Sequence, residues 1–428
     1  MNKKLRSLLL ALLALVLTVC VAAILIVRLT LAPAAGEWST RLRLGPYTFD
    51  ASVPATIRLA TSSWVAPLLD GRALDTRYGI VRLAWLAERS ALELRCAPCT
   101  ATVTALGTQP LRVAQLVATV RRDGNALAGQ LEVAPVGTGE ASLQGRWEGR
   151  LGPKAMPMQF ELQEAPITQW YAVLAPGLPE LQQGRISGRM ALRGQITLPD
   201  GAFMLQPRIA QFNVEGLGTQ EMLGARSGCG APSRLTKDSW LARTVIAAED
   251  QRFFTHPGYD LTELMASLDA NQKRDQVERG GSTLSQQLAR LLVTGSERSA
   301  QRKLRELLYA VEMEQTLGKA RILQLYLDNA PWGARGLCGA EAAAVRYFGR
   351  PAARLEPAQA VWLAAMLNNP QHAVDQWQRE GHIDAARVRW VAEGVRGIAR
   401  PQREALLKSV ANASFAAPKL VADDTGGR

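Results

Sequence analysis

Residues 249–258 read EDQRFFTHPG: two adjacent carboxylates, an aromatic pair, a histidine and a Pro-Gly turn. The preceding segment 238–248 has apolar residues at helical spacing, and Asp238 or Ser239 can cap its start. The sequence therefore predicts a helix that places Glu249 at its end, where the carboxylate can point into a cleft. An acidic residue on a helix is most often a solvated charge. Here the apolar neighbours would raise the pKa of that carboxylate and make it a better base near neutral pH.

Two more polar patterns lie downstream of this stretch. Residues 280–290 read GGSTLSQQLAR, where the leucines fall on one helical face and polar residues on another. The glycine pair leaves backbone N–H groups open to an anion, or simply gives an ordinary helix a flexible start. Residues 302–306 read RKLRE, in which Arg302 and Glu306 lie about one helical turn apart. They form either a surface ion pair or part of a cationic patch that faces a diphosphate.

The bulk composition is that of a globular protein with anionic partners. The chain has 428 residues, enough for two or three domains, and 47% of them are hydrophobic. The formal net charge of +12 favours nucleic acid, anionic lipid or a diphosphate as a partner.

The N-terminus carries an unbroken apolar run, residues 8–27, preceded by Lys3, Lys4 and Arg6. A run of about twenty such residues spans a hydrocarbon core of about 30 Å. The excess of positive charge before the run places the N-terminus in the cytoplasm and the bulk of the chain across the membrane. The sequence therefore predicts a single-pass anchor; the alternative is a cleaved signal peptide, because residues 32–35 read APAA. This topology excludes nucleic acid as a partner.

From about residue 36 to residue 218 apolar and polar residues alternate, between turns rich in glycine and proline. Such alternation predicts antiparallel strands with one buried and one solvated face, here a mostly β domain that curves over an apolar interior. A helical segment interrupts the strands at 167–174. After Cys229 the apolar period changes to 3.6, which predicts a mainly helical C-terminal region.

In order and spacing, the C-terminal motifs resemble those of the peptidoglycan glycosyltransferases, the family that includes the glycan-polymerising half of class A penicillin-binding proteins. That family has Glu-Asp-x-x-Phe-x-x-His-x-Gly, Gly-Gly-Ser-Thr-x-x-Gln-Gln-Leu and Arg-Lys-x-x-Glu, and this chain carries all three. Residues 319–327 and 339–350 resemble its fourth and fifth motifs. The resemblance covers residues 240–371. The Ser-x-x-Lys motif of a transpeptidase does not occur in the sequence.

The resemblance implies a mainly α, lysozyme-like domain that polymerises lipid II, a disaccharide-pentapeptide on a polyprenyl diphosphate. It makes Glu249 the general base. Glu306 would orient the diphosphate or a divalent cation (Mg or Mn) bound to it, or assist departure of the leaving group; no organic cofactor is implied. Arg290, Arg302 and Lys303 would neutralise phosphate charge. The other substrate-binding residues that it implies are Asp250, Phe253, His256, Ser282, Thr283 and Gln287.

The chain departs from the family pattern at three positions. Arg290 stands where lysine is usual, which keeps the charge but changes the geometry of phosphate contacts. Leu291 and Asp328 each replace a frequent asparagine. These changes leave both acids intact and bear on processivity and donor contacts.

The resulting organisation is a multidomain chain. It comprises a cytoplasmic N-terminus and transmembrane anchor (1–35), a β-rich periplasmic domain (36–225), an α-helical glycosyltransferase domain (226–415) and a disordered tail (416–428). Its partners would be lipid II, the nascent glycan, the inner membrane and a separate transpeptidase. The rhythm of strands and turns in the β domain resembles the AsmA-like envelope proteins, which hold lipid in a groove. The alternative is a spacer that holds the enzyme off the membrane.

Two other functions fit parts of the sequence. A hydrolase of the same lysozyme-like shape would cut glycan, but a neutral glycan strand needs no phosphate clamp. A non-enzymatic lipid-binding protein would use the β domain and keep the helical domain as a relic, but both acids, Glu249 and Glu306, are intact.

Four cysteines lie on the exported side under this topology, where disulfides form. Cys229 precedes the first catalytic helix and Cys338 precedes the last motif, so both flank the same predicted cleft and we expect them to be bonded. Cys96 and Cys99 would then pair with each other or remain thiols; the competing pattern joins one of them to Cys229. A zinc site is not expected, because there is one Cys-x-x-Cys and only three histidines.

Overall fold

The computed structural model divides into two compact units, one built mainly of strands and one mainly of helices. It describes residues 3–44, 47–101, 111–135, 141–274, 280–297, 299–333 and 336–417. Within these ranges the first unit holds residues 3–101, 111–176 and 189–209, and the second holds 177–188 and 210–417. The second unit therefore begins before residue 226, the predicted start of the helical domain. Residues 418–428 of the predicted disordered tail lie outside the described residues.

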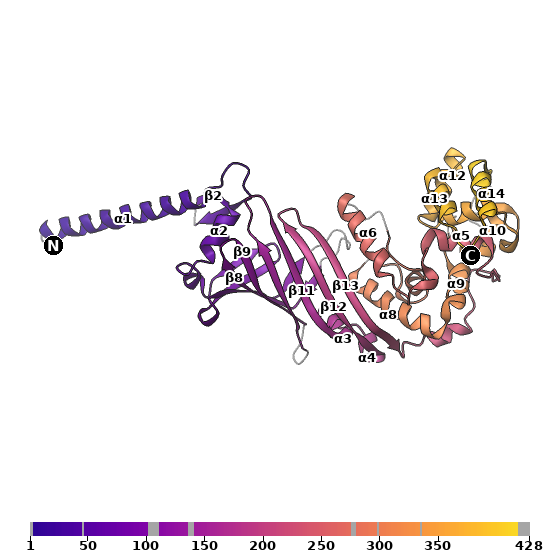
Figure 1. Cartoon of the computed structure of the whole chain (residues 1–428), viewed down its shortest axis with the longest axis horizontal. Helices are drawn as coiled ribbons and strands as arrows, with labels where there is room; N and C mark the ends of the chain where they lie inside the picture. The colour runs from indigo at the N-terminus through magenta and orange to yellow at the C-terminus, as the bar shows by residue number, and fades with distance from the viewer. Residues whose placement is uncertain are drawn as a thin grey trace, which may run out of the picture. The chain divides into compact units, whose positions relative to one another are not determined.

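The first unit begins with a long apolar helix, α1 (Lys3–Leu31), drawn in indigo in Figure 1. Its segment Leu12–Leu31 is long and apolar enough to cross a membrane. The helix ends two residues before Pro33, whose ring cannot continue a helix. The predicted apolar run is thus helical over its whole length.

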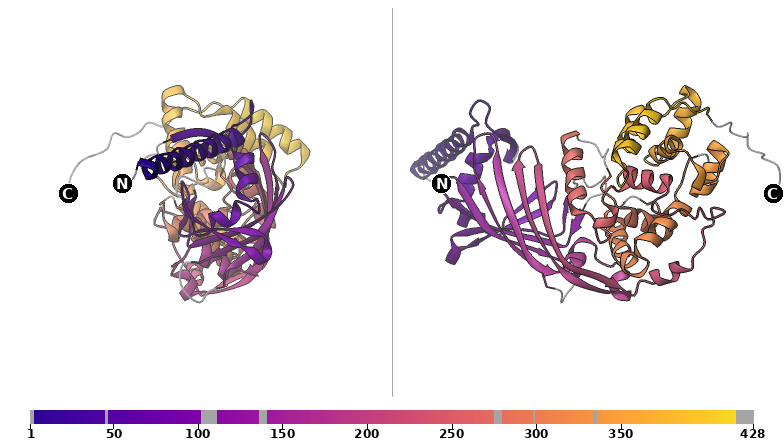
Figure 2. Two further views of the ribbon diagram at one scale, coloured as in Figure 1. Left: turned by 90° about the vertical axis from the view of Figure 1, so that its left-hand side faces the viewer. Right: turned by 45° about the vertical axis from the view of Figure 1, so that its right-hand side comes forward.

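A nine-stranded antiparallel sheet forms the body of this unit, with the order β13-β12-β11-β10-β9-β8-β5-β4-β3. Most neighbours in the sheet are also neighbours in sequence, as short hairpin connections require. The sheet is curved (Figure 2). Its strands are β3 (Ala73–Thr76), β4 (Gly79–Leu86), β5 (Ala91–Cys96), β8 (Gln115–Asp123), β9 (Ala126–Ala134), β10 (Leu143–Arg150), β11 (Met156–Pro166), β12 (Arg185–Leu198) and β13 (Ala202–Glu215). Two small antiparallel pairs accompany it, β1 (Ser39–Leu44) with β2 (Tyr47–Ser52) and β6 (Cys99–Ala101) with β7 (Leu111–Val113).

One face of the sheet is apolar and buried. In β10 the residues Leu143 and Trp147 are buried, and those between them alternate in exposure, as the predicted period of two requires. Helix α3 (Ile167–Leu174) packs Trp170 onto this face, and it occupies the segment predicted to be helical. Helix α2 (Val53–Ala60), which the sequence did not predict, contributes to a second apolar cluster on the same unit.

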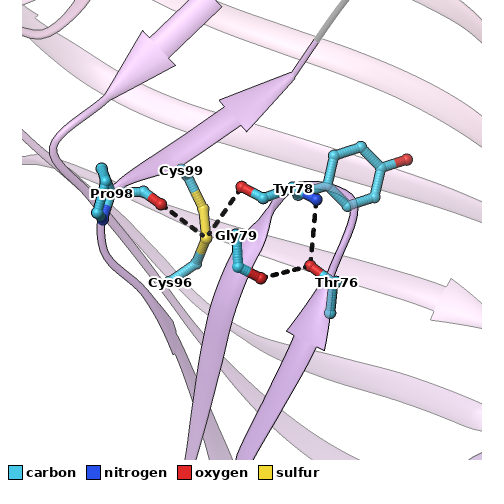
Figure 3. The surroundings of a disulfide bond; sticks show 6 residues. All are labelled: Thr76, Tyr78, Gly79, Cys96, Pro98 and Cys99. Carbon is cyan, nitrogen blue, oxygen red and sulfur yellow. Dashed lines mark hydrogen bonds between the residues drawn. A yellow bond between two sulfur atoms is a disulfide. The ribbon is translucent and has the colours of Figure 1, made fainter.

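The Cys96–Cys99 disulfide joins the end of β5 to the start of β6 (Figure 3). The carbonyl oxygens of Tyr78 and Pro98 each lie 3.7 Å from the Cys96 sulfur. Gly79 has φ +127°, and a Cβ atom there would lie 2.6 Å from the Pro98 carbonyl oxygen, so only glycine fits this turn. Cys96 and Cys99 are therefore bonded to each other, which is one of the alternatives that the sequence left open.

The second unit is helical and is built around α11. Residues 359–366 of this helix are all buried, because its sequence is apolar on every side. The helices are α4 (Glu180–Gln183), α5 (Trp240–Glu249), α6 (Leu261–Arg274), α7 (Leu284–Ala289), α8 (Ala300–Thr316), α9 (Gly318–Asn329), α10 (Ala340–Phe348), α11 (Pro357–Met366), α12 (Pro370–Glu380), α13 (Ala385–Gly394) and α14 (Arg400–Ala411). A π-helical turn, Arg290–Thr294, continues α7.

Cys229 and Cys338 form the second disulfide, across 109 residues of sequence and with 5.2 Å between their Cα atoms. Next to it, Asp328 of α9 accepts hydrogen bonds from the backbone and side chain of Ser233 at 2.9 and 2.8 Å. The predicted pairing of these two cysteines is therefore the one in the structure, and it ties the segment before α5 to the segment before α10.

Candidate active site

A cleft of about 830 Å³ opens in the helical unit beside the end of α5. Glu249, the last residue of that helix, lines it with 13% of its side chain exposed. The helix thus places this carboxylate as the sequence predicted. The other polar residues that line the cleft include Asp250, Arg252, Glu263, Ser282, Thr283, Gln287, Arg290, Asp384 and Arg387.

Two donors hold the Glu249 carboxylate. The Gln287 amide donates to Oε2 at 3.1 Å, and the Arg387 guanidinium donates to Oε1 at 3.2 Å. The Tyr326 hydroxyl donates to the amide oxygen of Gln287 at 3.1 Å, so the amide must turn its NH₂ group towards Glu249. Burial raises the pKa of Glu249, and Arg387, Gln287 and Arg290 only partly oppose this rise. A carboxylate of raised pKa that remains open to a cleft is suited to act as a general base.

Asp250, in the wall of the cleft, pairs with the buried side chain of His256. His256 Nε2 lies 2.9 Å from Asp250 Oδ2, and the backbone N–H of Gly258 donates to His256 Nδ1 at 3.2 Å. Since Nδ1 accepts this bond, it is Nε2 that donates to Asp250. Asp250 also accepts from the backbone N–H of Leu284 at 2.9 Å, which joins the first motif to the start of α7.

Two residues of the first motif that were predicted to contact a substrate lie in the interior of the protein. Phe253 is fully buried and His256 is 6% exposed, and neither lines the cleft. Thr283 caps α7 through the N–H of Gln286 and donates to the Gly258 carbonyl oxygen at 2.7 Å. These side chains hold the first two motifs together. Direct contact with a substrate is open to Ser282 and Gln287, which line the cleft.

The second carboxylate, Glu306 on α8, is 1% exposed and clamped by two cations. Arg302 donates to Oε1 and Lys303 to Oε2, both at 2.7 Å. The ion pair considered from the sequence is therefore present, but both side chains are largely buried and do not lie at the surface. Lys303 also donates to the Ser282 hydroxyl at 2.6 Å, which links this triad to the edge of the cleft. The Lys303 side chain is 44% exposed, on the solvated side of the helix as predicted.

Arg290 supplies the positive charge that remains available in the cleft. It begins the π-helical turn and lines the cleft, and within the described ranges no ion-pair partner is found for it. Arg302 and Lys303 carry two positive charges and Glu306 carries one negative charge, so this triad adds a net charge of +1. Such an arrangement attracts an anionic group such as a phosphate.

The surroundings of Glu306 do not fit a divalent cation. Both carboxylate oxygens are already hydrogen-bonded to cationic groups, which would repel a metal ion. Among the described residues there is no group of three His, Cys, Asp or Glu side chains placed to hold a metal. A divalent cation bound to the diphosphate, as the sequence suggested, stays a prediction.

Arg387 is a site residue that sequence reasoning did not find. It lies 138 residues after Glu249, outside the five motifs, and its guanidinium stacks on the Trp390 ring at 4.5 Å. Gly394 lets α13 approach α5, because a Cβ atom there would lie 2.7 Å from the Gln251 amide nitrogen and 3.3 Å from the Ala247 carbonyl oxygen. No local pattern around Arg387 signals this placement.

The fourth and fifth motifs form the framework behind the cleft. Lys319 donates to the His256 carbonyl oxygen at 2.7 Å and lies over the Phe253 ring. Glu341 accepts from the backbone N–H of Ala352 at 2.9 Å, and the Tyr347 hydroxyl donates to the Trp332 carbonyl oxygen at 2.6 Å. In these contacts the residues of the fourth and fifth motifs hold the framework of the helical unit together.

The site thus places a carboxylate of raised pKa beside cationic side chains, a combination suited to acid–base chemistry on an anionic group. Residues 235–395 match the family model described as Transglycosylase. The chain is 46% identical over 148 residues to the biosynthetic peptidoglycan transglycosylase of Nitrosomonas eutropha, covering 35% of this chain and 60% of that protein. For the proteins of the same name from Azoarcus sp. and Aromatoleum aromaticum the identities are 47% over 131 residues and 43% over 149 residues. Those alignments cover 31% and 35% of this chain, and 56% and 64% of the relatives. The chain spans about 60% of the length of these relatives.

Replacing Arg387 with methionine should shift the pH dependence of activity to higher pH. The base must be ionised to work, and the cation beside it opposes the rise in the pKa of Glu249. Removing the cation therefore raises this pKa further, so activity falls more at about pH 5 than at about pH 8. The measurement is the initial rate with lipid II as the test substrate across that range. Arg389→Met, on the exposed side of the same helix, is the matched control and should keep the parental profile.

Proposed function

We propose that the chain is a membrane-anchored peptidoglycan glycosyltransferase that polymerises lipid II into glycan strands and releases polyprenyl diphosphate. The observation that carries the proposal is the cleft in which Glu249, with its raised pKa, lies beside Arg290, in the region of the chain that resembles transglycosylases. The same proposal assigns residues 226–415 a lysozyme-like fold.

In the proposed reaction Glu249 accepts the proton of the 4-hydroxyl of an acceptor N-acetylglucosamine. The oxygen forms a bond to C1 of the donor N-acetylmuramic acid, and the bond from C1 to the diphosphate breaks. Gln287 and Arg387 orient the Glu249 carboxylate for this transfer. Arg290 and Lys303 stabilise the negative charge that develops on the departing diphosphate. Glu306 keeps Arg302 and Lys303 fixed, so the charge of Lys303 needs no rearrangement during the reaction.

The anchor fits the substrate. Helix α1 offers one apolar span, and lipid II carries a polyprenyl tail that stays in the bilayer. The proposal therefore places the protein in the inner membrane, with its N-terminus in the cytoplasm and its bulk in the periplasm. A separate transpeptidase partner and an AsmA-like lipid-holding role for the β domain stay predictions.

The proposal is tested with the full-length protein in detergent micelles. We expect it to convert fluorescent lipid II into long glycan chains, and to leave finished glycan strands uncut. Shortening of finished glycan without polymerisation of lipid II would support the hydrolase instead. Failure of both reactions would favour the lipid-binding alternative.

Replacing Lys303 with methionine should lower polymerisation far more than it lowers stability. The variant loses the charge predicted to face the diphosphate, while Glu306 keeps Arg302 as its partner. We expect a loss of about 100-fold in kcat/KM, the order found when a preorganised donor is removed. The measurements are the rate of polymerisation and the melting temperature. Lys408→Met, an exposed lysine of α14, is the control; a parallel loss of both quantities in Lys303→Met would point to a purely structural lysine.

A further inference from the structure

Helix α8 carries a third cation, Arg305, besides Arg302 and Lys303, which clamp Glu306. Arg305 directly precedes Glu306, and consecutive residues point about 100° apart around a helix. Arg305 therefore faces away from the carboxylate that Arg302 and Lys303 share.

Glu180 holds Arg305. This residue starts the short helix α4, is 1% exposed, and accepts from Arg305 Nε at 2.6 Å. The other carboxylate oxygen of Glu180 is buried, and in the described part of the chain it has no hydrogen-bond partner. A buried carboxylate depends strongly on its ionic partner, so this pair fixes the direction in which Arg305 points.

The same face of α8 is fixed at a second point. Arg305, Glu312 and Thr316 lie on one face of the helix, at i, i+7 and i+11. Glu312 accepts from the backbone N–H groups of Leu217 and Thr219 at 2.7 and 3.3 Å, and the Thr219 and Thr316 hydroxyls are 2.7 Å apart. Glu180 lies in residues 177–184, which precede β12, and Leu217 and Thr219 lie in residues 216–219, which follow β13, so α8 holds two segments that are far apart in the sequence.

We propose that Glu180 is a positioning residue for the transfer reaction: its ion pair with Arg305 sets the rotation of α8 and thereby the places of Lys303 and Glu306. This inference rests on the proposed function. Glu180 lies outside residues 235–395, the region matched by the transglycosylase family model. The site of this protein therefore depends on a residue from the segment that connects the strands.

The test uses the full chain with Glu180→Gln, which keeps the shape and an acceptor for Arg305 but removes the charge. We expect kcat for lipid II polymerisation to fall about tenfold, because small displacements of catalytic groups cost that much or more, with KM nearly unchanged. In a Lys303→Met background the same change should cost less than about twofold, since Glu180 acts through the groups already lost. An equal tenfold loss in both backgrounds would overturn the proposal, as would unchanged activity.

Leu406→Ala, a buried change in α14, serves as the control for lost stability alone. Glu180→Gln must lose more activity than this variant at equal melting temperature; an equal loss would refute the positioning role. Hydrogen exchange of the α8 amides provides a readout that does not need activity. We expect Glu180→Gln to speed exchange in α8 while the α14 amides keep the parental rate. If the parent makes no glycan, the proposed function fails, and unchanged exchange in α8 would separately overturn the inference.

Discussion

Glu249→Gln should lose polymerising activity by about 100- to 1,000-fold, the contribution typical of general-base catalysis. Glutamine keeps the shape of the side chain and one oxygen that can accept from Arg387 or Gln287, but it cannot take the acceptor proton. The loss should appear in kcat, since the hydroxyl is deprotonated only as the transition state is approached. The measurement is the initial rate of glycan synthesis from lipid II.

The matched control is Glu380→Gln, at the exposed end of α12, which should retain parental activity. Melting temperatures of both variants establish that the fold persists. Activity of Glu249→Gln within about threefold of the parent would rule out Glu249 as the base.

Removing the Cys229–Cys338 disulfide should give the largest loss of stability of any change considered for this protein. The bond closes 109 residues of chain, and for a loop of this length the chain-entropy relation assigns about 4.7 kcal/mol. We expect the double variant Cys229→Ala/Cys338→Ala to lose up to about this free energy of unfolding in the helical unit. The measurement is urea unfolding of oxidised protein, with the helical unit followed by hydrogen exchange of its own peptides.

The other disulfide provides the control. Cys96 and Cys99 are three residues apart, so the same relation assigns their bond only about 1.6 kcal/mol. A Cys96→Ala/Cys99→Ala variant should leave the helical unit at parental stability, because both residues belong to the strand-built unit. Peptide mapping without reductant must also recover Cys229 bonded to Cys338; alkylated thiols, or a peptide joining Cys229 to Cys96 or Cys99, would contradict the pairing.

The sequence predicted features that depend on local periodicity. An apolar run at the N-terminus is helical in α1, alternating residues form the sheet, and segment 167–174 is α3 with the predicted bounds. Helix α5 ends at Glu249 as expected, because its apolar spacing and the turn that follows it are both determined by residues close together in the sequence. Helix α2 was missed, since eight residues between strands give too short a periodic pattern to distinguish from a turn.

The motifs were found from the sequence, but the separate structural roles of their residues were not. Phe253 and His256 were expected to contact a substrate, whereas the structure buries them as a support for α7. The pair at Arg302 and Glu306 reads as a surface contact from spacing alone. Only the packing of α8 shows that Glu306 is buried and shared with Lys303.

By itself, the sequence determined the order of elements, the ends of the helices that carry the acids, and the chemistry available at each motif. These features follow from residue spacing within one or two turns. The tertiary structure alone decided which distant groups meet them: Arg387 reaches Glu249 across 138 residues, and Glu180 reaches Arg305 across 125. Such contacts depend on how closely helices approach, as at Gly394, where a Cβ atom would lie only 3.3 Å from the Ala247 carbonyl oxygen of α5. Close packing is a property of the whole fold, and no local pattern encodes it.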